Sequence, residues 1–263
     1  MLTRHEIIRR ADDDGVDAAV AERDYVLAHI VAQLHRATPA DGARLVFKGG
    51  TALRLVHVGA DYRYSADLDF SVVDGSVEAA LDALVGALDA AARHAKLPLL
   101  ELTTEQKPTI AYVGPLLSEK ARALKLDIQS GEHVERIEQH QVRSIWSDLP
   151  DGPSFDVYPV DEIAAEKLRC VIQRVQCRDL YDLHRLSTDL NVSLDEVRPL
   201  FERKAQAKDL DPSRFAEYFE RRLPNYKRTW EDEMGDHISS PPPFDKIHRE
   251  VRRNLRQAGL LTA

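Results

Sequence analysis

Two aspartates separated by one residue, Asp67 and Asp69, have the spacing in this sequence that most directly suggests chemistry. They begin a stretch, residues 67–73, whose first part alternates polar and apolar residues, as a β-strand does. Because side chains alternate between the two faces of a strand, both carboxylates are expected on one face. Like charges this close repel unless a cation lies between them, and Mg²⁺ prefers carboxylate oxygens. The pair therefore predicts a magnesium site, with Mn²⁺ as the alternative ion.

An isolated Asp-x-Asp is also typical of an edge strand whose polar face simply meets water. A third aspartate, Asp127, favours the metal site, because it lies in the middle of another predicted strand at residues 124–129. Three strand carboxylates can bind two metal ions, one activating an attacking hydroxyl and the other holding a triphosphate. We therefore expect Asp67, Asp69 and Asp127 to be metal ligands.

A glycine-containing turn precedes the aspartate pair, between a short apolar strand at 45–47 and a helical pattern at 52–57. Adjacent glycines let backbone N–H groups approach a ligand, and helix N-termini favour anions. By itself a Gly-Gly pair is more often only a tight turn, and the Asp-x-Asp strand that follows gives it meaning. The residues expected to meet the phosphates of a nucleoside triphosphate are Lys48, Gly49, Gly50, Thr51 and, one turn later, Arg54. The sequence has neither a Walker lysine motif nor Gly-x-Gly-x-x-Gly, which disfavours P-loop and Rossmann folds.

A lysine in a predicted helix at 160–176 forms a second site of interest. The polar residues of this helix project onto one face, and they are Glu162, Glu166, Arg169 and Gln173. Lys167 lies off that face among apolar neighbours, so it needs either a partner, such as phosphate or an aspartate, or a path along the surface to water. In the next predicted helix, 178–188, Asp182 is a candidate to orient Lys167 or to accept a substrate proton. A salt bridge with a nearby arginine would also explain Asp182, and Asp179 could be only a helix cap.

The composition is that of an ordinary globular protein, with 43% hydrophobic and 30% charged residues in 263. No apolar run is long enough to span a bilayer and the N-terminus lacks the apolar core of a signal peptide, so we expect a cytoplasmic protein without a membrane partner. The net charge of −8 argues against a protein that coats nucleic acid non-specifically. Two cationic segments, 218–230 and 246–256, could bind phosphates locally, although an amphipathic helix with a solvated face is the favoured explanation.

The remaining patterns predict an α+β fold, in which a core with a small mixed sheet precedes a helical domain. A composition change at the loop 147–154 places the boundary there, giving domains 1–150 and 151–263. The predicted elements of the core are helices within 5–37, broken at 12–15, and at 76–96, with strands at 97–103 and 109–113 besides those above. The predicted later helices lie at 160–176, 178–188, 193–208, 212–223 and 244–258.

Four motifs in order resemble the AbiEii family of nucleotidyltransferase toxins, and they are FKGGT at 47–51, YSADLDF at 64–70, EIAAEKL at 162–168 and RDLYDL at 178–183. The resemblance runs from about 25 to 186. It implies a polymerase β-like nucleotidyltransferase core joined to a helical domain, using magnesium and a nucleoside triphosphate. It further implies that Ser65 lies beside the triphosphate and that Lys167 and Asp182 are a later catalytic lysine and aspartate. Family members are toxins restrained by a separately encoded antitoxin, and by analogy the acceptor is the 3′ end of tRNA.

Three other functions compete with a nucleotidyltransferase. A haloacid-dehalogenase-like phosphatase also uses Asp-x-Asp, but there an apolar strand leads into the first aspartate, whereas residues 61–66 are largely polar. The upstream glycine turn disfavours a glycosyltransferase. A catalytically inactive binding module is disfavoured because Asp67, Asp69, Lys167 and Asp182 are all present. The sequence therefore predicts a metal-dependent nucleotidyltransferase toxin, with a metal-dependent phosphotransferase or phosphatase and the inactive module as alternatives.

Overall fold

The computed structural model describes residues 1–105 and 107–262, which form two compact units. Unit 1 contains Met1–Gly131 and Ile137–Tyr158, and unit 2 contains Glu132–Arg136 together with the chain from Pro159 onward. The boundary therefore falls after Tyr158 and not at the expected residue 150. The reason is a short strand, β7 (Phe155–Val157), which pairs with the sheet of unit 1.

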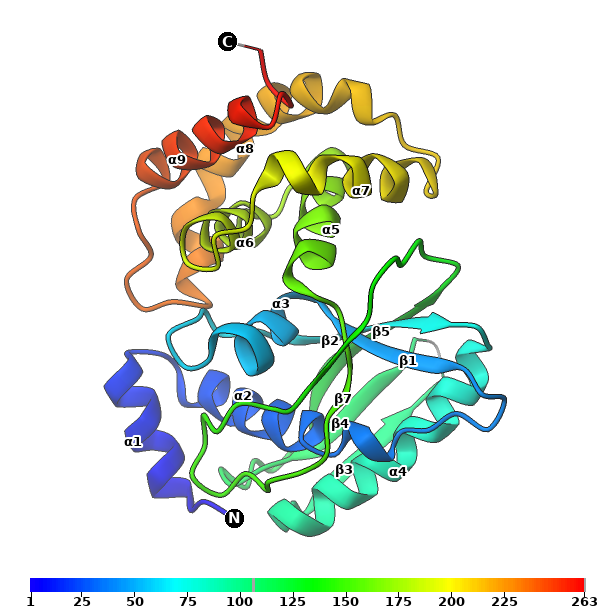
Figure 1. Cartoon of the computed structure of the whole chain (residues 1–263). Helices are drawn as coiled ribbons and strands as arrows, with labels where there is room; N and C mark the ends of the chain where they lie inside the picture. The colour runs from blue at the N-terminus through cyan, green and yellow to red at the C-terminus, as the bar shows by residue number, and fades with distance from the viewer. Residues whose placement is uncertain (106, 263) are drawn as a thin grey trace. The chain divides into compact units, whose positions relative to one another are not determined.

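Unit 1 is built on a mixed sheet, whose described strands have the order β3-β4-β5-β2-β1-β7-β6 (Figure 1). Their bounds are β1 Arg44–Lys48, β2 Asp67–Val73, β3 Leu99–Thr103, β4 Thr109–Val113, β5 Arg122–Ser130 and β6 Glu138–His140. At the centre, β2 runs antiparallel to β1 and parallel to β5. The predicted α+β class with a mixed sheet is confirmed, while β6 and β7 were not expected from the sequence.

Local signals explain where the helices of unit 1 begin and end. Thr3 and Glu6 form a capping box at the start of α1 (Arg4–Asp14), and Gly15 ends that helix in the left-handed conformation before α2 (Ala18–Val31). Ser76, the first residue of the predicted helix 76–96, caps α4 (Val77–Ala95) by accepting the N–H of Ala79. The other helical segments are α3 Gly49–Ala52, the 3₁₀ turn η1 Leu34–Arg36 and the π-helical turn η2 Leu53–Val58.

The register of the central strands gives the sheet one apolar and one polar face. Leu45 pairs with Val72, and Phe47 pairs with Phe70, which in turn pairs with Ile128. Helix α4 packs on this apolar face, where Ala80 and Val77 meet Val72, Leu45 and Ile128 (Figure 1). The alternate residues of β1, β2 and β5 must therefore lie on the opposite face.

Unit 2 consists mainly of the helices α5 Val160–Gln173, α6 Cys177–Thr188, α7 Leu194–Gln206, α8 Phe215–Gly235 and α9 Phe244–Gln257, with the 3₁₀ turn η3 Pro212–Arg214 before α8. Helix α8 extends well beyond the predicted end at 223, even though Pro224 lies inside it. Burial of Tyr226, Trp230 and Met234 beyond the proline explains the extension, because tertiary packing outweighs one lost backbone hydrogen bond.

The first turn of α5 buries a carboxylate, Glu162, against α7 and the 132–136 segment. The Glu162 carboxylate forms a 2.7 Å ion pair with Lys204 of α7. It also accepts the backbone N–H groups of Glu135 and Arg136 at 2.8 and 3.0 Å. Because a buried carboxylate needs such partners, Glu162 holds this short segment to unit 2 although it lies before β6 and β7 in the chain.

Candidate active site

The polar face of the sheet in unit 1 carries a row of charged residues across three strands. Asp69 on β2 pairs with Lys48 on β1 and with Asp127 on β5. Residues in direct register project to the same face, so one carboxylate lies between an ammonium group and a second carboxylate. The strand order thus brings together three predicted site residues, Lys48, Asp69 and Asp127. The first and the last of them are 79 positions apart in the sequence.

Asp67 lies two residues before Asp69 on the same face and pairs with Lys125 of β5. The Gln129 amide donates a 3.0 Å hydrogen bond to the carboxylate of Asp127. The carboxylates of Asp67, Asp69 and Asp127 and the lysines Lys48 and Lys125 therefore lie together on this face. Like charges directly opposite one another destabilise a sheet, and the lysines compensate part of the repulsion between Asp69 and Asp127.

The carboxylates suit a hard divalent cation in type and orientation, because such ions prefer carboxylate oxygens. Among the described residues, however, no three His, Cys, Asp or Glu side chains are grouped closely enough to hold a metal ion. Asp67 and Asp69 are two residues apart along a strand, a rise of about 7 Å. The arrangement therefore fits an ion held by one or two protein carboxylates, with substrate phosphates and water as its other ligands.

The glycine turn packs directly against this row. Gly49 has a φ of +79°, in the left-handed region, and a Cβ atom there would collide with the carboxylate of Asp69. A Cβ atom on Gly50 would collide with the guanidinium of Arg63, a buried residue that also donates to the Tyr64 carbonyl at 3.2 Å. The backbone therefore passes too close to the carboxylate of Asp69 at Gly49, and to the guanidinium of Arg63 at Gly50, for a side chain at either position.

Thr51 connects the turn to the start of β2. Its hydroxyl donates to the main-chain carbonyl of Asp67 and lies 2.8 Å from the Ser65 hydroxyl, and both side chains are buried. In this structure Thr51 fixes the backbone next to Asp67, and Ser65 lies beside it. Contact of Thr51 with a phosphate stays a prediction.

Arg54 was expected to add charge to the phosphate site, and the structure contradicts this expectation. Its side chain is 0% exposed, and its guanidinium forms a two-point ion pair with Asp24 through bonds of 2.5 and 3.1 Å. It also donates to the carbonyl of Tyr62 and stacks on the ring of Tyr64, 3.9 Å from the centroid. Arg54 therefore joins α2, η2 and the loop that leads to β2, because a buried guanidinium must be fully paired.

Tyr158, at the end of unit 1, supports the lysine of the row. The Lys48 ammonium lies 5.7 Å from the centroid of the Tyr158 ring, within the range of a cation–π contact. The Tyr158 hydroxyl is 2.7 Å from the Ser71 hydroxyl of β2, and its backbone N–H donates to Phe47 at 2.9 Å. Lys48 is thereby held beside Asp69 in a buried setting.

In unit 2, Lys167 has the acidic partners that its inward position required. Its ammonium is 2.9 Å from Asp179 and 2.7 Å from Asp182, and all three side chains are buried. Arg174 also donates to Asp179, at 2.9 and 3.2 Å. The contact of Asp182 with Lys167, one of the two explanations considered for Asp182, is present in the structure. Asp179 is more than a helix cap, because it receives two cations.

The charge of Asp179 is stabilised in spite of its burial. Burial alone would raise the pKa of this carboxyl, but the ammonium of Lys167 and the guanidinium of Arg174 hold its pKa below the usual value. The charged Asp179 in turn favours a charged Lys167. Unit 2 thus contains a buried ammonium group in a fixed orientation.

The comparison with protein families decides the identity. A family model described as "Nucleotidyl transferase AbiEii toxin, Type IV TA system" matches residues 33–250. The chain belongs to the AbiEii family. This AbiEii protein is therefore a nucleotidyltransferase toxin of a type IV toxin–antitoxin system, as its four motifs predicted. Its class of enzyme takes the nucleotidyl group from a nucleoside triphosphate and generally requires a divalent metal ion, and its system includes an antitoxin.

Two solved structures are similar to the AbiEii chain, and the first, MenT4, supports its fold. MenT4, a nucleotidyltransferase toxin from Mycobacterium tuberculosis, is similar over 100% of this chain and 91% of its own, with a TM-score of 0.60 and 18% sequence identity. An antigenic nucleotidyltransferase-like protein from Paracoccidioides brasiliensis matches 62% of this chain and 73% of its own, with a TM-score of 0.37 and 14% identity. No curated protein sequence matches the chain. No helix within residues 1–105 and 107–262 has both the length and the apolar character needed to cross a membrane.

Several residues of the AbiEii site could not be singled out in the sequence. Arg63 and Lys125 lie among other charged residues, and their positions follow only from the turn geometry and the strand register. Tyr158 follows a strand too short to be recognised. Asp179 had a usable signal, because it precedes Asp182 by three residues and therefore shares a helix face with it.

Proposed function

We propose that this toxin transfers a nucleoside monophosphate from a nucleoside triphosphate to the 3′ end of tRNA and thereby blocks translation. The observation that carries the proposal is the register of Asp69 with Lys48 and Asp127, behind a turn at Gly49 that admits no side chain. Mg²⁺ would be held by Asp69 with Asp67 or Asp127, and Mn²⁺ could replace it. The cytoplasm, which contains tRNA and nucleoside triphosphates, is the corresponding location.

The residues of the turn have distinct tasks in this proposal. Gly49 and Gly50 would present backbone N–H groups to the triphosphate, Lys48 would supply positive charge, and Ser65 would lie beside them. The oxygen of the acceptor hydroxyl attacks the α-phosphorus and loses its proton, while the bond to the β-phosphate breaks and pyrophosphate leaves. When bound, the divalent ion supplies charge that favours the deprotonated hydroxyl and the departing pyrophosphate.

Unit 2 supplies two further residues to the proposal. From the resemblance of their motifs to those of the family, Lys167 and Asp182 would be a later catalytic lysine and aspartate. The ion pairs of Lys167 with Asp179 and Asp182 keep its ammonium charged and directed, which suits contact with an anionic substrate. A separately encoded antitoxin would restrain the activity of this toxin.

The test is transfer of label from each nucleoside triphosphate in turn to total tRNA, with Mg²⁺ and the purified chain. The inactive variant is Asp69→Asn, which keeps the size of the side chain but removes its charge. The matched control is Asp74→Asn, just beyond the same strand, where the residue is exposed and has a φ of 59° that asparagine tolerates well.

We expect label in RNA with the unmodified chain and with the Asp74 variant, and at least about 10²-fold less with the Asp69 variant, because a ligand of the metal and phosphates is lost. Chelation of the divalent ion should abolish transfer and added Mg²⁺ should restore it. Hydrolysis of simple phosphate esters without transfer would instead assign the carboxylates to a phosphatase. Binding of a triphosphate with neither reaction would indicate an inactive binding module.

A further inference from the structure

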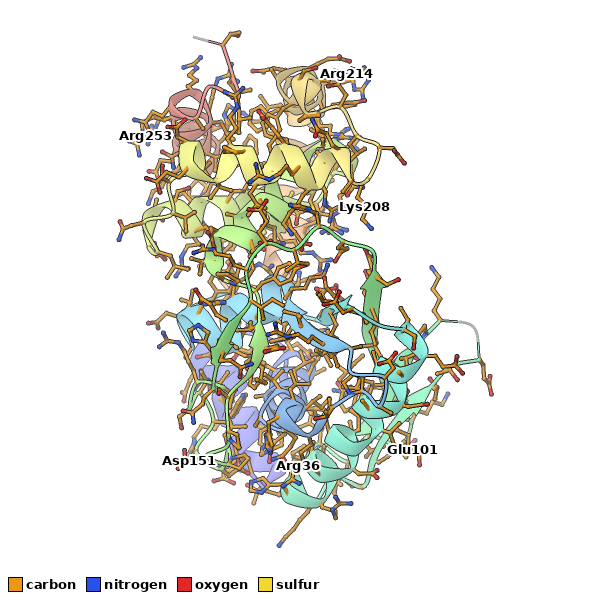
Figure 2. The ribbon with its side chains drawn as sticks, turned by 45° about the vertical axis from the view of Figure 1, so that its right-hand side comes forward. Arg36, Glu101, Asp151, Lys208, Arg214 and Arg253 are labelled. Carbon is orange, nitrogen blue, oxygen red and sulfur yellow. The ribbon has the colours of Figure 1, made fainter. Side chains whose placement is uncertain are left out.

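Four exposed cations form one stripe along α9, the last helix of unit 2. They are Lys246, Arg249, Arg253 and Arg256, spaced by three, four and three residues. At 100° per residue they fall within about 80° of the helix circumference. The apolar residues of the helix, Phe244, Ile247, Val251 and Leu255, are buried and face the opposite way. Figure 2 shows Arg253 at the outer side of α9.

The cations of the stripe have no ion-pair or hydrogen-bond partners among residues 1–105 and 107–262. Several neighbouring cations of unit 2, in contrast, do form ion pairs. Arg252 of the same helix pairs with Glu220 at 2.6 Å, and Lys227 pairs with Asp245 at 3.2 Å. In a chain with a net charge of −8, four adjacent cations without such partners form a local positive surface.

The two acidic residues of α9 are engaged with neighbouring helices and neutralise this surface only in part. Asp245 pairs with Lys227 of α8, and Glu250 pairs with His184 of α6. The pKa of Glu250 is lowered by its hydrogen bond with His184 and, to a smaller extent, by the charges of Lys246 and Arg253, so this one carboxylate offsets part of the charge of the stripe. Both acids therefore fasten α9 to its neighbours and leave the outer face cationic.

A second cationic cluster in unit 2 is less available to a ligand. The guanidinium groups of Arg214, Arg221 and Arg222 lie 4.8, 4.9 and 5.0 Å from the centroid of the Tyr218 ring. Arg214 already pairs with Glu217 at 2.8 Å, and Arg222 donates to the carbonyl of Val171. Since these donors are used within the protein, the stripe on α9 is the stronger candidate surface.

We propose that the outer face of α9 binds the phosphate backbone of the RNA acceptor. The choice of RNA as the anionic partner rests on the function proposed above. The stripe is about 15 Å long, and its neighbouring charges are about 4.5–6 Å apart along the axis, from a rise of 1.5 Å per residue. A row of regularly spaced cations complements a row of phosphates and carries no base preference. Lys246 and Arg249 lie within the match to the family, which ends at residue 250, whereas Arg253 and Arg256 lie beyond it, so the surface extends past the matched region.

The surroundings of the stripe favour nucleic acid over two other anionic partners. A membrane-binding helix inserts apolar side chains beside its cations, but the apolar residues of α9 are buried in unit 2. A stable protein interface has a core rich in aromatic and apolar residues, whereas Asn254 and Gln257 accompany the cations here. Phosphate contact requires only the charges that are present.

The test measures how RNA affinity depends on salt. A fluorescent tRNA transcript is titrated with the full chain without triphosphate or divalent ion, at several salt concentrations. The variant replaces Lys246, Arg249, Arg253 and Arg256 with Gln. The matched control replaces four exposed cations of unit 1, Arg4, Arg93, Lys107 and Lys120, with Gln, which changes the net charge equally. Thermal unfolding of both variants verifies that they fold.

We expect the slope of log K against log salt to fall by about 3 in the α9 variant, from about 0.7–0.9 per lost phosphate contact, and affinity at 0.1 M salt to drop about 10²–10³-fold. The control variant should bind nearly as the unmodified chain does. Equal affinity of the two variants for RNA would overturn the proposal. Loss of binding only to phosphatidylserine vesicles, with RNA binding unchanged, would also overturn it and assign the stripe to a membrane surface.

This measurement separates the surface from the reaction. Binding is recorded without a triphosphate, so stripe-dependent RNA binding can be observed even if the chain transfers no nucleotide. In that case the surface would stand and the proposed reaction would fail. Transfer to tRNA combined with stripe-independent binding would leave the reaction in place and refute the surface.

Discussion

Replacing Gly49 with alanine tests whether the glycine turn and Asp69 work as one site. Gly49 and Gly42 both have a φ of +79°, so alanine costs about 1–2 kcal/mol of backbone strain at either position. They differ in their surroundings. A Cβ atom at 42 has nothing within 4 Å, whereas one at 49 collides with the carboxylate of Asp69. Gly42→Ala therefore reports the strain alone.

The collision at residue 49 must be relieved by moving Asp69. Rotating its side chain away from a staggered rotamer costs about 0.5–1.5 kcal/mol. We therefore expect Gly49→Ala to lower the free energy of unfolding by about 1.5–3.5 kcal/mol, from the sum of the two terms, and Gly42→Ala by about 1–2 kcal/mol, from the strain alone. A catalytic group displaced by about 1 Å can cost about 10²-fold in rate, so the effect on activity should be much larger than the effect on stability.

The assay compares kcat/KM for nucleotide transfer with chemical denaturation of the same preparations. Gly49→Ala should lose at least about 10²-fold in kcat/KM, while Gly42→Ala should stay within about threefold, since only the former moves Asp69. Equal losses in the two variants would refute the reasoning, because strain would then account for the whole effect. Full activity of Gly49→Ala would show that the carboxylate of Asp69 does not act where it packs against the turn.

Three further outcomes are expected from other parts of the structure. Lys167→Met should destabilise the protein by about 3–5 kcal/mol in denaturant titrations, because it leaves the buried carboxylate of Asp179 without its ammonium partner, and adding Asp179→Asn should recover part of that loss. Burial lowers the pKa of His29 to about 4, below its usual 6.5, so the unfolded chain binds this proton first as the pH falls. Stability should therefore drop between about pH 6.5 and 4, by about 2 kcal/mol at pH 5, and His29→Gln should remove this part of the pH dependence. Arg54→Met should lower the melting temperature and not raise the KM for triphosphate in the fraction that remains folded, because Arg54 pairs with Asp24 and not with substrate.

The position of Asp67 and Asp69 on one face of β2 could be predicted from the sequence, because it depends only on the local alternation of side chains. Residues 67–73 form β2 as expected, and Asp67 and Asp69 share a face because strand side chains alternate. Membership in the AbiEii family was also accessible, since its motifs are short, ordered and local. The same holds for Ser76, whose capping role is set within one helical turn.

Arg54 and Thr51 make contacts with residues distant in sequence, which local patterns did not reveal. Arg54 carries the charge and spacing of a phosphate ligand, but its partner Asp24 lies 30 residues earlier in α2. Thr51 has a hydroxyl at a helix start, but the carbonyl that accepts its proton is 16 residues later. No local pattern distinguishes a donor aimed at a ligand from one used within the protein. Only the fold reveals which hydrogen bonds are already made.

The domain boundary was misplaced for a related reason. Pro153 and Gly152 mark a loop, and a loop in sequence does not reveal which unit its two ends join. The three residues of β7 are too few for a period-two pattern, yet their pairing with β1 and β6 keeps them in unit 1. Conversely, Glu132–Arg136 lies before those strands and belongs to unit 2 through Glu162.

The apolar face of the sheet determines the chemistry of the polar face. A slip of one residue between β1 and β2, or between β2 and β5, would move Phe47, Phe70 or Ile128 out of the core and would cost much of their burial. The packing of α4 on that face therefore fixes which residues stand opposite Asp69 on the other. Lys48 and Asp127 meet Asp69 because the core allows only this register, so the charged row is preorganised by hydrophobic packing on the far side of the same three strands.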